Sequence, residues 1–118
     1  MKITDIHWLA GLLDGEGCIS LRVEHYKSKS YPLIGIHLVM TDKGPVAKAA
    51  NLFMCKVYEY KIKSGKIAYR TNVYGKEAAS WLMTLYPLLC ERRQAKAREC
   101  IAAWKAAPTR SGKREKVL

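Results

Sequence analysis

Acidic residues and long apolar runs are both scarce in this sequence. Only 10 of the 118 residues are Asp or Glu. No apolar stretch approaches the ~18 residues that a membrane-spanning helix needs, and the first five residues lack the layout of a signal peptide. We therefore expect a soluble, intracellular protein without a membrane partner, located in the cytoplasm, the nucleoid or an organelle matrix.

Closely spaced cysteines are absent as well. The four cysteines, Cys18, Cys55, Cys90 and Cys100, lie far apart, and none forms a C-x-x-C pair. This spacing argues against a zinc site or a disulfide framework. We expect free thiols that are buried in the core.

What the sequence has in excess is positive charge. Lys and Arg together number 21, which gives a formal net charge of +11. In a small domain such an excess indicates a polyanionic partner, most often nucleic acid. The alternatives are charge that serves only solubility, and a structural role in a ribonucleoprotein.

Hydrophobic periodicity predicts one α+β domain over residues 1–107, followed by a basic tail at 108–118. We expect helices over 5–14, 42–53, 76–85 and 87–104, with Thr4 as the N-cap of the first helix. Strands are expected over 18–26 and 33–41, with a loop at 26–32 between them. A hairpin over 57–73 is expected to turn at Ser64–Gly65.

Alternation along these strands gives the predicted sheet one apolar face and one polar face. The apolar face would pack on the helices, and the polar face would stay open. Arg22, Lys61, Lys63 and Arg70 are expected to share the open face. A twisted sheet with such a face can lie in the major groove of DNA, where side chains reach base edges. A solvated surface is the alternative.

The stretch LAGLLDGEGCI, residues 9–19, breaks several local rules at once. Gly11 and Gly15 each weaken a helix by about 1 kcal/mol relative to alanine. Asp14 and Glu16 fall at the helix C-terminus, where the helix dipole disfavours acids. Such a concentration of unfavourable choices is typical of a functional site.

The first nine residues of this stretch, LAGLLDGEG, resemble the LAGLIDADG motif of homing endonucleases. The segments IHLVMTD (36–42) and YPLLCERRQAKA (86–97) resemble later parts of the same family, so the resemblance extends over residues 6–104. It implies the LAGLIDADG fold, αββαββα, with a four-stranded antiparallel sheet packed on helices. It also implies site-specific cleavage of double-stranded DNA by an enzyme encoded in an intron, an intein or another mobile element.

The sequence contains only one copy of the motif, and single-motif members of this family act as homodimers on palindromic or near-palindromic DNA. The resemblance therefore implies that two motif helices pack side by side, with the glycines allowing close approach. The implied interface residues are Leu9, Ala10, Gly11, Leu12, Asp14 and Gly15.

The resemblance also implies metal-dependent hydrolysis. Glu16 takes the place of the family's acidic metal ligand, where aspartate is commoner, and the carbonyl of Gly15 would be a second contact. The implied cofactor is Mg²⁺ or Mn²⁺, which suits carboxylate, carbonyl and phosphate oxygens. Asp14 is either part of this site or a hydrogen-bonding group at the helix end.

Three further catalytic positions are implied by the same alignment. Asp42 corresponds to a polar residue that orients water near the metal, and the N-cap of the next helix is its alternative role. The family's lysine ahead of a Gln-Ala pair corresponds to Glu91 or, with a one-residue shift, to Arg92. We take Arg92 as the catalytic cation and Gln94 as its support.

The open sheet face and its loops supply the expected DNA contacts. Candidates for reading bases are Ser20, Arg22, Glu24, Tyr26, His37, Glu59, Lys61, Lys63, Arg70 and Asn72. Arginine and lysine pair with guanine, asparagine with adenine and glutamate with cytosine. Lys27, Lys29, Lys66 and the basic tail are expected to contact phosphates.

A cleavage-deficient module on the same fold is the alternative function. Glu91 at the expected lysine position favours it, because an acid there would not stabilise the negative charge of the transition state. Such a module would act as an intron maturase or a regulator, and RNA would be a partner only in that case.

Overall fold

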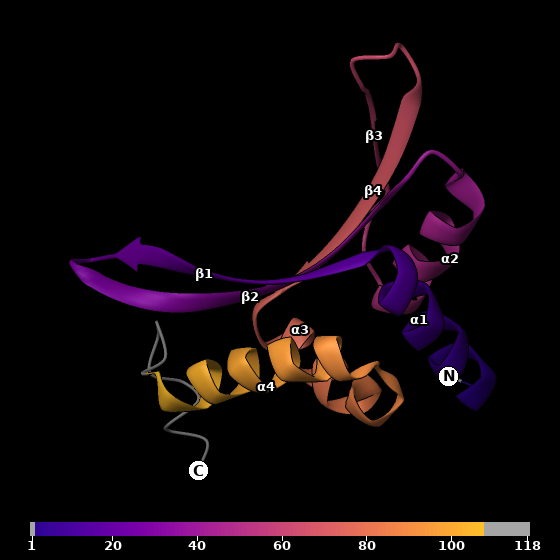
Figure 1. The fold of residues 1–118 in the computed structure, drawn as a ribbon. Coiled ribbons are helices and arrows are strands. Elements are labelled where there is room, and N and C mark those ends of the chain that lie inside the picture. The colour runs from indigo at the N-terminus through magenta and orange to yellow at the C-terminus, as the bar shows by residue number, and fades with distance from the viewer. Residues whose placement is uncertain (1, 108–118) are drawn as a thin grey trace.

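One antiparallel sheet joins the four strands of the described chain in the order β1-β2-β4-β3 (Figure 1). The computed structural model describes residues 2–107, so Met1 and the predicted basic tail at 108–118 lie outside the described residues. The elements are α1 (Ile3–Glu16), β1 (Gly17–Tyr26), β2 (Lys29–Met40), α2 (Lys43–Phe53), β3 (Tyr58–Lys61), β4 (Ile67–Tyr74), α3 (Gly75–Leu85), the 3-10 helix η1 (Tyr86–Leu88) and α4 (Glu91–Ala106). This order confirms the expected α+β fold, αββαββα, with α4 added at its end.

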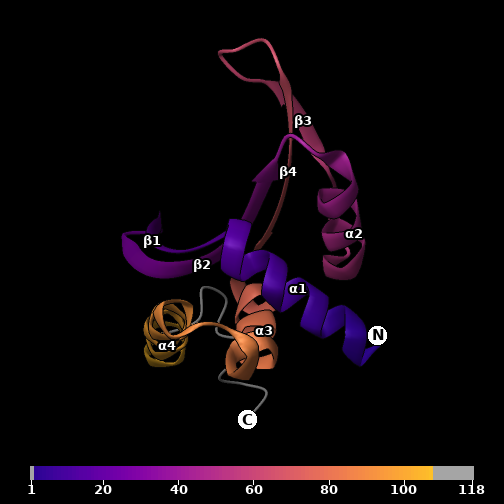
Figure 2. The same cartoon turned by 45° about the vertical axis from the view of Figure 1, so that its right-hand side comes forward.

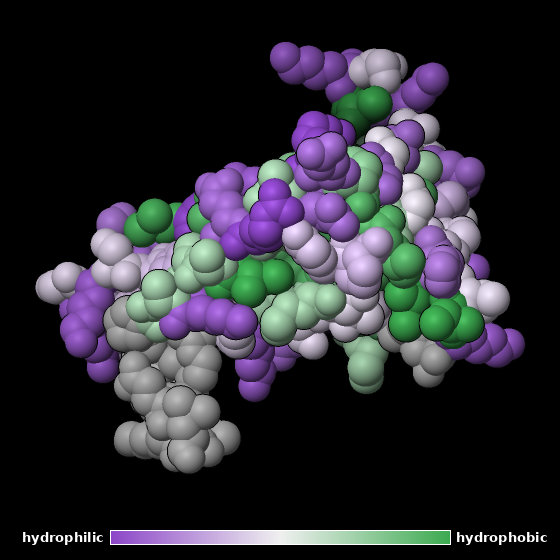
Figure 3. Space-filling view, turned by 60° about the horizontal axis from the view of Figure 1, so that its bottom comes forward, coloured by the Kyte–Doolittle hydropathy of each residue, from purple (hydrophilic) through white to green (hydrophobic). Residues whose placement is uncertain are grey.

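The helices cover one face of the sheet and leave the other face open. Figures 1 and 2 show α1, α3 and α4 beneath the sheet and α2 beside β4. The β1–β2 and β3–β4 hairpins extend in different directions, so the open face is concave. On the helix side, hydrophobic surface remains among hydrophilic residues (Figure 3).

Alternation in β2 and helical spacing in α1 build the core between these layers. Leu9 and Leu13 are four residues apart, so they project from the same side of α1. Together with Ile36 and Leu38 of β2 and Leu82 of α3 they belong to one hydrophobic cluster, and each is at most 1% exposed. Burial of such a side chain contributes about 1.5–3 kcal/mol, so this cluster fixes α1 against the sheet.

The β1–β2 connection is much shorter than the predicted loop at 26–32. Tyr26 pairs with Lys29, which leaves a turn of only Lys27 and Ser28. Both turn residues have positive φ angles, 50° and 65°, as in a type I′ turn, whose geometry suits the twist of paired strands. Glycine and asparagine are the usual residues in this turn, so the sequence carries no signal for it.

Helices α1 and α4 differ from the predictions at both ends, and each ends two residues later than expected, at Glu16 and Ala106. Helix α1 begins at Ile3 with Lys2 as its N-cap residue, so Thr4 lies inside the helix and the predicted Thr4 cap is wrong. Helix α4 begins at Glu91 because Pro87 lies in η1, before it. The other two helices agree with prediction within one residue. In the described part of the chain, no helix is both long enough and apolar enough to cross a membrane.

The four cysteines are free, as expected, but they are not all buried. Cys100 is fully buried, and burial raises the pKa of its thiol. Cys55 is half-buried, and desolvation raises its pKa as well. Cys18 and Cys90 are exposed, which corrects the expectation that these thiols lie in the core.

Candidate active site and nucleic-acid interface

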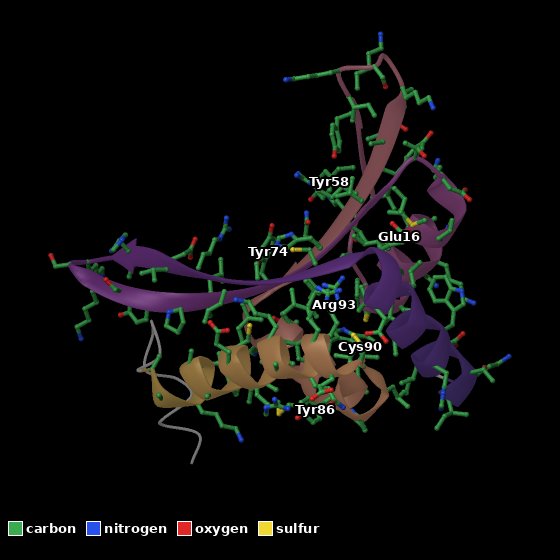
Figure 4. All side chains as sticks on the ribbon, viewed as in Figure 1. Glu16, Tyr58, Tyr74, Tyr86, Cys90 and Arg93 are labelled. Atoms are coloured by element: carbon green, nitrogen blue, oxygen red, sulfur yellow. The ribbon has the colours of Figure 1, made fainter. Side chains whose placement is uncertain are left out.

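Helix α1 runs directly into strand β1, and Glu16 is the last residue of the helix. Gly17 opens the strand, and its N–H donates to the carbonyl oxygen of Leu13. A Cβ on Gly17 would lie 2.9 Å from the Leu13 Cα and carbonyl oxygen and 2.6 Å from Cδ2. Glycine is required at this junction because those backbone atoms cannot move aside. The junction leaves Glu16 exposed where the helix meets the sheet (Figure 4).

The outer face of α1 carries two of the predicted interface glycines. Gly11 and Gly15 are exposed, and a Cβ added at either would meet no atom within 4 Å in the described chain, the helix's own backbone aside. The packing of a single chain therefore does not require glycine at these positions. Leu12 is partly exposed beside them. Leu9 and Ala10, by contrast, are 0% and 1% exposed, so these two residues belong to the core and not to the outer face.

Asp14 connects the end of α1 to the start of α4. Both of its carboxylate oxygens accept from the Cys90 N–H, at 3.0 and 3.1 Å. Cys90 is the N-cap residue of α4, so the acid lies at the positive end of that helix dipole. This contact explains why an acid is tolerated at the C-terminal end of α1. It gives Asp14 the helix-end role that the sequence left open.

Arg93, rather than the predicted Arg92, contacts the motif helix. The Nη2 of Arg93 donates to the carbonyl oxygen of Asp14 at 3.4 Å, and Figure 4 shows Arg93 between α4 and the end of α1. Its Nε is buried and has no hydrogen-bond partner among residues 2–107. Arg92 and Glu91 are exposed. The cation next to the end of α1 is therefore Arg93, which sequence reasoning missed.

Gln94 and Asp42 make local contacts that support the scaffold. Gln94 Nε2 donates to the Tyr86 carbonyl oxygen at 2.9 Å and ties η1 to α4. Asp42 Oδ1 accepts from the Gly44 N–H at 3.2 Å and caps α2. The N-cap alternative for Asp42 is thus confirmed, while its role near a metal stays a prediction.

The described residues fit a divalent metal site in part. Glu16 and the main-chain carbonyls at the end of α1 offer oxygen ligands, the type that Mg²⁺ and Mn²⁺ prefer. Over residues 2–107, no three His, Cys, Asp or Glu side chains come together as a metal site. A metal at Glu16 would therefore need further ligands from outside this chain, such as a second carboxylate or phosphate oxygens.

Three of the predicted base-reading residues form one hydrogen-bonded chain across the open face. Ser20 Oγ lies 2.9 Å from His37 Nε2, and His37 Nδ1 lies 2.8 Å from Asn72 Oδ1. These residues come from β1, β2 and β4. Tyr74 packs edge-on against His37, with ring centres 5.4 Å apart. We call Ser20, His37, Asn72 and Tyr74 the central cluster.

Arg70 lies on the same open face, between two tyrosines that sequence reasoning missed. Its guanidinium carbon is 6.0 Å from the ring centre of Tyr58 and 5.8 Å from that of Tyr60. Figure 4 shows Tyr58 and Tyr74 on the open side of the sheet. Arg70 pairs with Tyr58, and successive residues of a strand alternate between faces. Glu59 and Lys61 are therefore on the opposite face, and the prediction that Lys61 shares a face with Arg70 is wrong.

The other predicted contacts lie along β1 and at the two hairpin turns. On β1, Arg22 lies over the ring of Tyr74, 5.5 Å from its centre, and Glu24 and Tyr26 follow toward the turn. The exposed lysines near the turns are Lys27 and Lys29 on the β1–β2 hairpin and Lys63 and Lys66 on the β3–β4 hairpin. Positive charge thus lies at both ends of the open face.

Solved structures with similar backbones are homing endonucleases. I-CvuI in complex with its target, in the presence of Ca, matches with a TM-score of 0.71 and 19% identity over 93% of this chain and 73% of that chain. I-CvuI in complex with the I-CreI target, in the presence of Mg, matches with a TM-score of 0.70 and 20% identity over 92% and 72%. The LAGLIDADG homing endonuclease I-LtrWI, bound to target DNA, matches with 0.58 and 19% over 79% of this chain and 34% of that chain. This chain has the LAGLIDADG homing endonuclease fold.

The similarity is one of fold, because these identities are 20% or lower. The sequence matches no family model and no curated protein. Within the LAGLIDADG fold of this chain, Glu16 ends the motif helix α1. The central cluster lies on the sheet face that is turned away from the helices, on β1, β2 and β4.

Proposed function

We propose that this chain is a site-specific, metal-dependent DNA endonuclease that acts as a homodimer. Two copies of α1 would pack through Gly11 and Gly15, and the two open sheet faces would lie along one near-palindromic duplex. Phosphodiester hydrolysis would take place where the two copies of Glu16 meet. The structural neighbour I-LtrWI is bound to target DNA, which supports DNA as the partner.

The observation that carries the proposal is the position of Glu16. It is exposed at the end of a helix face that carries two exposed glycines, and the next residue begins the open sheet. In a chain of net charge +11, one acid beside a nucleic-acid surface would only repel phosphate. Two such acids brought together by a symmetric dimer would instead bind divalent cations between protein and DNA.

Each residue of the site would have a separate task. Glu16 would bind Mg²⁺ or Mn²⁺ through a carboxylate oxygen, with the carbonyl of Gly15 as a second ligand. The bound metal would supply an activated water and neutralise charge on the phosphate. Arg93 would hold positive charge beside the scissile phosphate. Asp14 would keep the start of α4, which carries Arg93, against α1.

Replacement of Glu16 separates catalysis from binding. We expect Glu16→Gln to bind DNA at least as tightly as wild type, because it removes a negative charge near phosphate, and to cut at least about 100-fold more slowly. A target is first selected by binding from a randomised duplex pool in Ca²⁺, and its cleavage is then measured in Mg²⁺. Glu77→Gln makes the same chemical change at an exposed acid of α3 and is expected to cut like wild type.

Loss of folding or of DNA binding in Glu16→Gln would contradict the proposal, because it would give Glu16 a structural role. Circular dichroism and the binding selection itself provide these two readouts.

A cleavage-deficient DNA- or RNA-binding module is the second candidate function. The observation in its favour is the acidic residue Glu91 at the start of α4, where the family resemblance implies lysine. Glu91 is exposed, however, and Arg93 supplies the cation that contacts α1. Selective binding by wild type without cleavage in Mg²⁺ or Mn²⁺ would decide for this second candidate.

A further inference from the structure

In the central cluster the side-chain oxygen of Asn72 is turned toward His37. The His37 imidazole lies between Ser20 and Asn72, and both of its ring nitrogens are within 2.9 Å of a partner oxygen. Asn72 presents its Oδ1 to the ring, so His37 Nδ1–H donates to it. In a neutral imidazole the other nitrogen is an acceptor, and Nε2 therefore accepts from the Ser20 hydroxyl.

This arrangement leaves the NH₂ group of Asn72 as the polar group that can face DNA. The amide oxygen is turned toward His37, and the nitrogen with its two N–H donors lies on the other arm of the amide. Asn72 is half-buried in the interior of β4, and a 180° turn of its amide would bring its NH₂ group against the Nδ1–H of this His37 tautomer, donor against donor. The group that Asn72 offers on the open face is a donor that has no acceptor among the described residues.

Packing around His37 prevents the ring from moving away. A Cβ on Gly35 would lie 2.7 Å from His37 Nε2 and 2.9 Å from Ser20 Oγ, so glycine provides the space in which this hydrogen bond forms. Tyr74 packs edge-on against the ring, and Arg22 lies over the face of Tyr74. The imidazole is therefore enclosed on several sides, and the amide that it holds is preorganised.

We propose that Asn72 reads its base through N–H donors only and selects guanine rather than adenine. An asparagine that reads adenine uses its oxygen to accept from N6 and its NH₂ to donate to N7. Here the oxygen is engaged by His37. Guanine presents two acceptors, N7 and O6, on its major-groove edge and no donor. The inference rests on the proposed function, in which the open sheet face lies in the major groove, and it replaces the adenine pairing expected from residue type alone.

A change of Asn72 from donor to acceptor tests the inference. Asn72→Asp keeps the shape and the oxygen facing His37 but replaces NH₂ with a second oxygen. We expect wild type to prefer guanine at one position of each half-site. Asn72→Asp is expected to shift that preference by about tenfold toward cytosine or adenine, whose N4 or N6 donates. Base preference is measured at every position from the duplexes bound out of a randomised pool in Ca²⁺.

Two further variants separate orientation from charge. Asn51→Asp makes the same change at an exposed position of helix α2 and is expected to leave the base profile unchanged. His37→Phe keeps an aromatic ring but removes the hydrogen bond to Oδ1, so the amide can turn. We expect adenine to gain about tenfold relative to guanine at the same position in this variant.

Each contrary result has a distinct meaning. A wild-type preference for adenine at the position that responds to Asn72→Asp would overturn the inference, because the oxygen would then face the DNA. A sequence-selective wild type with no position that responds to Asn72→Asp would overturn it as well, while leaving the proposed function intact. Binding by wild type without any sequence preference would overturn the proposed function together with the inference.

Discussion

The half-buried guanidinium of Arg93 makes few hydrogen bonds to replace those that it would make to water in the unfolded chain. Its Nη2 donates to the Asp14 carbonyl oxygen at 3.4 Å, and its Nε has no partner among the described residues. A buried, unpaired polar group costs about 1–3 kcal/mol. Residues kept at such a cost are typically functional, which agrees with the role proposed for Arg93 beside Glu16.

Replacing Arg93 is expected to affect activity more than folding. Arg93→Met should lower the cleavage rate at least about 10-fold, while the free energy of unfolding stays within about 1 kcal/mol of wild type. Single-turnover cleavage and urea unfolding measure the two effects. Arg92→Met removes the same charge from an exposed neighbour and should change neither. A loss of more than about 2 kcal/mol of stability in Arg93→Met would show that the residue is structural.

The place of Glu16 at the end of the motif helix follows from the sequence, whereas the contacts of Arg93 and Tyr58 do not. Glu16 belongs to a contiguous motif, so it can be aligned with the family motif in only one way. The basic segment before Gln94 can be aligned with the family lysine at Glu91 or at Arg92, and neither alignment gives Arg93. Arg93 lies one helical turn before the buried Ala97, so the phase of α4 turns it toward the core. Strand β3 is exposed along its whole length. Because neither face of β3 is buried, the hydrophobic pattern of this strand does not show that Tyr58 lies on the same face as Arg70.

At the scale of elements, one face of helix α1 is buried in the core and the other is exposed. Leu9 and Leu13 on the inner face join the core. Gly11 and Gly15 on the outer face are exposed and have open space around them. Each glycine weakens the helix by about 1 kcal/mol relative to alanine. A second α1 packed closely against this face would make up for that loss.

A large residue on the outer face should separate the subunits without unfolding them. Gly11→Leu places its side chain in open space within one chain and gains about 1 kcal/mol of helix propensity, so we expect a folded monomer. Sedimentation velocity reports the oligomeric state, and far-UV circular dichroism reports the fold. Gly44→Leu, at an exposed glycine of α2, should leave the dimer intact. An undisturbed Gly11→Leu dimer would contradict the proposed interface.

The elements that could be predicted are those whose periodicity is set by burial. Helices α2 and α3 each present an apolar face to the core, strands β1 and β4 contribute Ile19 and Val73 to it, and the bounds of all four agree closely with expectation. The turn at Lys27 and Ser28 could not be predicted, because neither residue is typical of the positive φ angles that it adopts. The start of α4 could not be placed from the sequence because Pro87 also suits the separate turn η1.

At the scale of the whole molecule, positive charge is expected to contribute most of the affinity in the proposed binding to DNA. The net charge is +11, and exposed lysines lie near both hairpin turns of the open face. Each phosphate that a lysine or arginine neutralises releases counterions from the duplex. Because many such contacts would form in a dimer, binding should depend steeply on salt concentration.

The salt dependence gives a quantitative test of this electrostatic contribution. If six or more phosphates are neutralised, the association constant should fall about 10³-fold or more between 50 and 200 mM salt. Fluorescence anisotropy with a labelled duplex measures it. The paired variant Lys27→Ala/Lys66→Ala is expected to reduce the slope of log K against log salt by about 2 per subunit. A slope near zero in wild type would contradict a binding surface of this kind.

The measurement that tests the central claim most directly is sequencing of the ends produced when wild type cuts randomised duplex DNA in Mg²⁺. A homodimer with a shared active site predicts products cut on both strands within one near-palindromic sequence, with no products in Ca²⁺. Products that share no sequence, or a shared sequence without two-fold symmetry, would contradict the claim.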